Sequence, residues 1–100
     1  MNAFSLSGSV ALVTGATGGI GRASCKALAE AGATVIATDL AASADVEGAS
    51  AYHPLDVTSE EAWRTLIGLV ERDHGRLDIL VNNAGISVTN SIADTSLAEF

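Results

Sequence analysis

The feature that most constrains this chain is a glycine-rich turn between an apolar run and a segment of helical composition. The run at residues 10–13 (VALV) leads directly into residues 14–21 (TGATGGIG), and residues 22–31 then have helical composition and spacing. Glycine lets a backbone turn sharply and approach a ligand without a Cβ in the way. The free N–H groups and positive dipole end of the new helix favour a pyrophosphate. Strand, glycine turn and helix in this order predict a phosphate-binding turn.

The rest of the chain alternates predicted strands and helices. Strands are predicted over residues 10–13, 33–39, 51–57 and 77–81, and helices over residues 22–31 and 58–74. Residues 40–50 are poor in large apolar side chains and can hold at most a short helix or an irregular crossover. Such alternation implies parallel strands joined by right-handed crossovers. We therefore expect an α/β, Rossmann-like doubly wound parallel sheet with strand order 3-2-1-4 for the portion present.

Capping signals mark the predicted helix ends. Gly32 and Gly75 follow the two predicted helices and suit their C-terminal caps. Thr58 and Glu61 have the spacing of a capping box, in which each side chain bonds the other's backbone N–H.

The last residues predict the start of a further helix. Ser96 and Glu99 form a second capping-box pattern, just before the sequence ends at Phe100, after a polar loop at residues 86–95. No repeat, low-complexity tract or linker interrupts the chain. We expect residues 1–100 to be one domain, incomplete at its C-terminus, and the N-terminal part of a longer chain.

Composition excludes several classes of function. The net charge is −7 and the five basic residues are scattered, which argues against a nucleic-acid partner. The single cysteine, Cys25, cannot form an internal disulfide and suits a reducing compartment. No signal-peptide pattern is present, and no apolar run approaches the roughly 20 residues of a membrane-spanning helix. We expect a cytoplasmic protein with no membrane partner.

Asp39 ends the second predicted strand, about 20 residues after the glycine turn, where dinucleotide-binding folds place an acid against the adenosine ribose. A carboxylate there accepts a hydrogen bond from the 2′-OH and repels a 2′-phosphate, which favours NAD over NADP. No Arg or Lys lies in the turn before Gly19 or just after Asp39 to reverse that preference. The alternative is an ordinary solvated aspartate at a strand end.

Small or polar residues also follow the other predicted strands. Asp56 lies at the end of the third strand, and residues 82–85 (NNAG) follow the fourth. Ligands of open α/β sheets bind outside the carboxyl ends of the strands, so these residues together predict a site. Singly, each could be a common turn former.

These motifs together resemble the short-chain dehydrogenase/reductase family, over nearly the whole chain. The resemblance rests on Thr14-Gly15-x-x-x-Gly19-Ile20-Gly21, Asp39, Asp56-Val57 and Asn82-Asn83-Ala84-Gly85. It implies that the turn binds the pyrophosphate, Asp39 the adenine ribose, and Asp56 and Val57 the adenine. The full set of cofactor-binding residues expected is Gly15, Thr17, Gly18, Gly19, Ile20, Gly21, Asp39, Leu40, Asp56, Val57, Asn83, Ala84 and Gly85. In this family the segment between Asp39 and Asp56 is usually longer, so its crossover helix is expected to be reduced to a turn.

The resemblance implies an NAD-dependent oxidoreductase that transfers hydride between nicotinamide and an alcohol or ketone. The family's catalytic Asn, Ser and Tyr-x-x-x-Lys lie downstream of the NNAG motif and have no counterpart in these 100 residues, since Tyr52 has no suitably placed Lys. Catalytic residues are expected beyond Phe100, and the full-length protein is expected to be a homo-oligomer. Two alternatives stay open: a non-catalytic nucleotide-binding module or truncated fragment, and a Rossmann-like domain that binds nothing.

The remaining single residues suggest no further chemistry. His53 and His74 lack a second ligand at metal spacing, so no metal site is expected. Trp63 and Cys25 are interpreted as packing residues.

Overall fold

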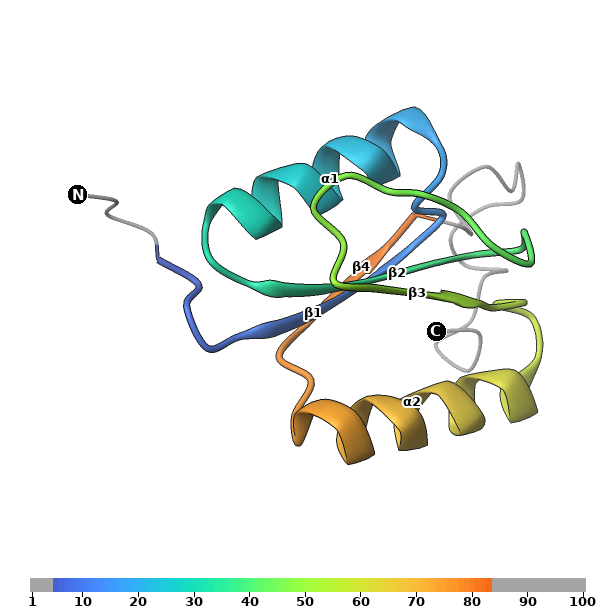
Figure 1. Ribbon diagram of the computed structural model, residues 1–100. Helices are drawn as coiled ribbons and strands as arrows, with labels where there is room; N and C mark the ends of the chain where they lie inside the picture. Colours follow the sequence, from blue (N-terminus) through green and yellow to red (C-terminus); the bar gives the residue numbers. More distant parts are fainter. Residues whose placement is uncertain (1–4, 84–100) are drawn as a thin grey trace, which may run out of the picture.

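The computed structural model describes residues 5–83, which form one parallel sheet between two helices. The sheet has the order β3-β2-β1-β4, and α1 and α2 cover its opposite faces (Figure 1). The elements are β1 (Val10–Thr14), α1 (Gly19–Glu30), β2 (Thr34–Asp39), β3 (Ala51–Pro54), α2 (Glu60–His74) and β4 (Ile79–Asn82). The predicted α/β class and the strand order 3-2-1-4 are confirmed.

Side-chain alternation along β1 and β2 builds a separate core on each face, because successive side chains of a strand point to opposite sides. Ala11, Val13, Val35 and Ala37 pack with Cys25 on the α1 side. The α2 side holds larger side chains, namely Val10, Leu12, Ile36, Leu55, Leu66 and Val70. Both central strands are buried on both faces, as expected for a parallel sheet covered by helices.

The connection from β2 to β3 contains no helix, so the expected reduction of this crossover to a turn is confirmed. Residues 40–50 run alongside α1 (Figure 1) and bury Val46 in the core on that side. A Cβ on Gly48, whose φ is +88°, would lie 3.0 Å from Ala29 Cβ on α1. At the start of the segment, the Tyr52 hydroxyl donates to the carbonyl of Ala41 at 2.7 Å. The loop therefore occupies the place on the sheet edge that a helix would otherwise cover.

Several predicted boundaries differ from the structure, including the start of α1, which lies at Gly19 rather than Arg22. The strand expected over residues 51–57 ends at Pro54, because proline has no N–H to continue a ladder. The capping box of Thr58 and Glu61 is wrong: Ser59 caps α2, and its side chain accepts from Ala62 N at 3.1 Å. The fourth strand begins at Ile79, two residues later than expected.

Both predicted glycine caps are confirmed. Gly32 (φ +104°) follows α1, and the N–H groups of Gly32 and Ala33 bond back to Ala29 O and Leu28 O. Gly75 (φ +77°) ends α2 and donates to Glu71 O. The predicted helix start at Ser96 and Glu99, and the loop at residues 86–95, lie outside the described residues.

Candidate functional site

The glycine turn after β1 brings the start of α1 very close to the strand. Gly15 adopts φ +61°, and the N–H of Gly18 donates to Gly15 O at 3.2 Å. A Cβ on Gly21 would collide with Gly15 O and lie only 2.7 Å from Ala16 Cα. The N–H of Ala16 also bonds Thr38 O on β2 at 3.0 Å. Any side chain at position 21 would force the helix away from the turn.

The N-terminus of α1 has no side-chain cap. Its cap residue is Gly18, in an extended conformation, and its first turn contains no acidic residue. The first N–H groups of a helix have no partner within that helix, and its N-terminal dipole end is positive. Ile20, in this turn, is 72% exposed. The first turn of α1 is thus chemically suited to hold an anion.

The Asp39 carboxylate faces the same turn from the end of β2. Its Oδ2 accepts from Thr17 N at 3.0 Å and Thr17 Oγ1 at 2.6 Å, and its Oδ1 accepts from Leu40 N at 2.8 Å. Burial raises the pKa of Asp39, but these hydrogen bonds outweigh it and hold the pKa below its ordinary value. A carboxylate can accept about four hydrogen bonds, so this charged group retains capacity for one more donor.

Asp56 is held in a second turn, after β3. Its Oδ1 accepts from Thr58 N at 2.9 Å and Thr58 Oγ1 at 2.6 Å. These bonds lower the pKa of the exposed Asp56 carboxyl. The bond from Leu55 N to Asp39 O, at 2.7 Å, ties this turn to the end of β2.

A hollow of about 440 Å³ lies where these strand ends meet. It collects seven of the predicted cofactor residues: Gly15, Thr17, Gly18, Asp39, Leu40, Asp56 and Val57. Gly19, Ile20 and Gly21 form the adjoining first turn of α1. Sequence reasoning missed three lining residues, Thr38, Leu55 and Thr58. Thr38 offered a signal, since it is a polar residue within an apolar strand, and its hydroxyl donates to Val13 O at 2.9 Å.

The predicted Asn83 lies at the end of β4, against the end of β1. Its backbone N–H donates to the hydroxyl of the buried Thr14 at 2.9 Å, and that hydroxyl lies 2.9 Å from Asn82 Oδ1. This network fixes β4 beside the glycine turn, at the point where the strand order reverses around β1. Ala84 and Gly85 lie outside the described residues.

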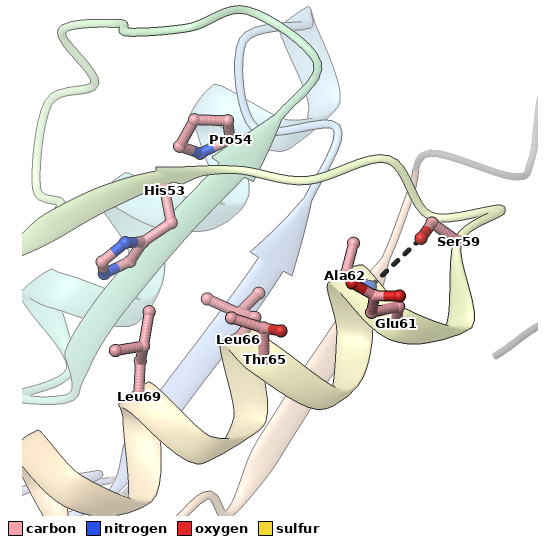
Figure 2. Close-up of a pocket in the computed structure, with 8 residues that line it drawn as sticks. All are labelled: His53, Pro54, Ser59, Glu61, Ala62, Thr65, Leu66 and Leu69. Atoms are coloured by element: carbon pink, nitrogen blue, oxygen red, sulfur yellow. Dashed lines mark hydrogen bonds between the residues drawn. The ribbon is translucent and has the colours of Figure 1, made fainter.

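A second hollow of about 490 Å³ lies between β3 and α2 (Figure 2). It shares no lining residue with the first and is bordered by His53 and Pro54 on β3 and by Leu66 and Leu69 on α2. The Ser59 hydroxyl at its border is already engaged in capping the helix. Residues 5–83 contain no group of three or more His, Cys, Asp or Glu side chains placed to hold a metal ion. No helix in the described part of the chain is long and apolar enough to cross a membrane.

Comparison with known proteins identifies the family of this chain. The family model described as short chain dehydrogenase matches residues 9–100. Gluconate 5-dehydrogenase of Gluconobacter oxydans is 46% identical over 92 residues, which cover 83% of this chain and 36% of that protein. The 3-oxoacyl-(acyl-carrier-protein) reductase of Haemophilus influenzae is 44% identical over 92 residues, covering 85% of this chain and 38% of that protein.

A solved structure of similar fold is the RhlG/NADP active-site complex of Pseudomonas aeruginosa. It superposes with a TM-score of 0.72 at 40% identity, over 84% of this chain and 37% of that one. The chain belongs to the short-chain dehydrogenase family, a family of oxidoreductases that bind a nicotinamide dinucleotide. It spans a little over a third of the length of these relatives.

Proposed function

We propose that this chain is the dinucleotide-binding part of an NAD-dependent short-chain dehydrogenase/reductase. The observation that carries the proposal is the hollow at the carboxyl edge of the sheet, where the glycine turn, the end of β2 and the turn after β3 converge. In open α/β sheets this is where dinucleotides bind. The close approach at Gly21 and the uncapped start of α1 fit a pyrophosphate.

Each part of the hollow would bind a different part of the cofactor. The N–H groups at the start of α1 would hold the pyrophosphate, with Thr17 and Ile20 as direct contacts. The Asp39 carboxylate would accept from the adenine ribose, and Leu40, Asp56 and Val57 would border the adenine. When bound, the nicotinamide supplies a carbon that accepts or donates hydride. The residues of this chain would bind and orient the cofactor, and Asn83, Ala84 and Gly85 would line it beyond β4.

The preference for NAD over NADP is argued from Asp39 and its surroundings. Its lowered pKa keeps the carboxylate charged at neutral pH, and none of the residues lining the hollow is a Lys or Arg. A 2′-phosphate would bring its own negative charge against Asp39 with no lining cation to offset it. The similar RhlG structure of Pseudomonas aeruginosa is a complex with NADP, so the proposed preference for NAD depends on Asp39 and on a lining that contains no Lys or Arg.

Calorimetric titration of the intact protein with NAD and with NADP tests this proposal. We expect saturable binding of both, with NAD bound at least about tenfold more tightly, a difference of about 1.4 kcal/mol. Tighter binding of NADP would overturn the assigned role of Asp39. Absence of binding to either nucleotide would favour a Rossmann-like domain without a ligand.

Hydride transfer to a ketone needs a proton donor, and hydride transfer from an alcohol needs a proton acceptor. We propose that the full-length protein carries a Tyr-x-x-x-Lys pair after the NNAG motif, together with the substrate pocket and the contacts of a homo-oligomer. Sequencing the gene beyond Phe100 separates the enzyme from a non-catalytic nucleotide-binding module. A cytoplasmic location also stays a prediction.

A further inference from the structure

Arg22 joins the glycine turn to the crossover loop between β2 and β3. Its Nε donates to the carbonyl of Thr17 at 2.9 Å, and its Nη1 donates to the carbonyl of Asp45 at 3.0 Å. Thr17 belongs to the glycine turn, and Asp45 lies in the loop that replaces a crossover helix. One guanidinium therefore holds two segments that the sequence places far apart.

Arg22 bonds a different kind of partner from the other three arginines. Arg64, Arg72 and Arg76 pair with the carboxylates of Glu60, Asp73 and Asp78, respectively. Arg22 instead donates to two backbone carbonyls, although the net charge of −7 means that carboxylates outnumber basic residues in the chain. A guanidinium presents several donors in a fixed planar fork, whereas a lysine ammonium is a single point. The geometry at Arg22 uses that fork.

Both the backbone N–H and the backbone carbonyl of Thr17 are therefore hydrogen-bonded to side chains. Its N–H and hydroxyl donate to Asp39 Oδ2, and its carbonyl accepts from Arg22. The orientation of the Asp39 carboxylate, the shape of the turn and the position of the loop are thereby linked through one residue.

The crossover loop has few other supports near the hollow. Val46 is buried against α1, and the Tyr52 hydroxyl holds Ala41, next to Leu40 at the border of the hollow. Between these two points Ala44 packs against the same core, and the bond from Arg22 to Asp45 O adds a side-chain hydrogen bond that fixes the loop against the turn. Loss of this bond would free the loop beside the hollow without removing any residue that lines it.

We propose that Arg22 is a positioning residue for the adenosine end of the cofactor site. Its fork holds the crossover loop against the glycine turn and keeps the Thr17–Asp39 pair aligned for the ribose. This inference rests on the proposed dinucleotide-binding function. Arg22 itself does not line the hollow, so its effect is carried through Thr17 and the loop.

The test is an Arg22→Met variant of the intact protein, which keeps an apolar stem of similar length and removes the donors. We expect about fivefold to tenfold weaker binding of NAD, consistent with losing bonds from a charged donor at an exposed site. AMP, which contains only the adenosine end, should lose affinity by the same factor. Amide hydrogen exchange over residues 41–49 should quicken in the ligand-free variant.

Two matched variants separate the fork from a general effect. Arg22→Lys keeps the charge but not the fork, so its affinity should stay close to that of Arg22→Met. Arg64→Met removes an arginine that makes an exposed pair with Glu60 on α2, and it should bind NAD like the wild type.

The outcomes that overturn the inference are distinct from those that overturn the proposed function. Wild-type binding in Arg22→Met, full rescue by Arg22→Lys, or an unchanged affinity for AMP would each overturn the role of the fork alone. A wild-type protein that binds neither nucleotide would overturn the proposed function, and this inference with it.

Discussion

The two helices of this chain begin in opposite ways, although both follow a strand of the same parallel sheet. The first turn of α2 is closed by its own residues: Ser59 caps it, and Glu60 and Glu61 lie against the positive end of its dipole. The first turn of α1 has Gly18 as its cap residue and contains no acid. The start of α2 is capped by a side chain of the protein, and the start of α1 has no side-chain cap.

The difference in capping between the two helix starts is a better indication of function than the volume of the hollows. The hollow beside α2 is about as large as the hollow at the glycine turn, roughly 490 against 440 Å³. Yet the border of the α2 hollow includes a helix start whose donor and dipole are already satisfied. The start of α1, which has no side-chain cap and no acidic residue in its first turn, adjoins the carboxyl edge that the charged Asp39 also faces. We therefore favour the hollow at the carboxyl edge of the sheet, beside the uncapped start of α1, as the binding site.

Substitution of Gly21 is expected to have the largest effect on this comparison. In Gly21→Ala the new Cβ would meet Gly15 O and Ala16 Cα, both backbone atoms that cannot move aside easily. We expect a loss of about 3 kcal/mol in the free energy of unfolding, at the upper end for overpacking, and no measurable NAD binding. Urea unfolding and calorimetry would measure the two effects.

Gly68→Ala is the matched control for this substitution. Gly68 lies within α2, and a Cβ there would meet nothing within 4 Å. Alanine should raise the stability by about 0.5–1 kcal/mol through helix propensity and leave NAD binding unchanged. Equal effects of the two substitutions would show that the close approach at Gly21 is unimportant.

Gly18→Asp would make the start of α1 resemble the start of α2. A Cβ on Gly18 would lie 3.6 Å from Gly15 O, an ordinary contact, so the backbone accepts the change. Aspartate is a good helix cap, and we expect the stability to rise by a few tenths of a kcal/mol. The carboxylate would occupy the place of the pyrophosphate, and NAD binding should fall about 100-fold, or about 2.7 kcal/mol.

Gly18→Asn tests whether charge causes that loss. Asparagine caps a helix about as well as aspartate does but is neutral. Its affinity for NAD should lie between those of the wild type and Gly18→Asp. An unchanged affinity in Gly18→Asp would contradict the assignment of this helix start to an anion.

The sequence predicted the sheet order and most of the residues that line the hollow, because the signals are local and repeat at each strand end. Short apolar, β-branched runs such as residues 34–37 favour a buried strand. The glycine turn and Asp39 both follow strands, so they lie at the carboxyl edge of the sheet. Seven predicted cofactor residues line the hollow, although their contact with a cofactor stays a prediction.

The cap of α2 and the bond from Arg22 to Asp45 O could not be predicted, because the sequence pattern allows more than one partner for these side chains. Thr58 and Ser59 are both good caps, and the Thr58 hydroxyl instead bonds Asp56, which leaves Ser59 to cap the helix. The link from Arg22 to Asp45 O needs the loop to lie along α1, which follows only from the tertiary packing of Val46 and Gly48.

Asp39→Asn should change how stability and binding depend on pH. The folded-state pKa of Asp39 is lowered, so the charged form stabilises the native protein above the unfolded-state pKa, near 3.9. That contribution is lost as the pH falls through the folded-state pKa. The difference in unfolding free energy between wild type and Asp39→Asn should therefore be constant above about pH 5 and shrink below about pH 4.

The same variant should lose about tenfold in NAD affinity at pH 7, since a neutral amide is a weaker acceptor for the ribose, and its preference for NAD over NADP should narrow. Acid unfolding followed by circular dichroism, with calorimetry at pH 7, measures both. A stability difference that grows on acidification would contradict the direction of the pKa shift.

The smallest expected effect is at the start of α2, where Ser59→Ala removes the cap without touching the proposed site. The orphaned Ala62 N–H would turn to water, and the free energy of unfolding should fall by about 1 kcal/mol with NAD affinity unchanged. Thr58→Ala is the control, because its hydroxyl bonds only the exposed Asp56 in that turn and should cost less. If Thr58→Ala proved the more destabilising, the capping box would be the working cap in solution. If Ser59→Ala weakened NAD binding, the start of α2 would belong to the site, and the two helix starts would no longer differ in function.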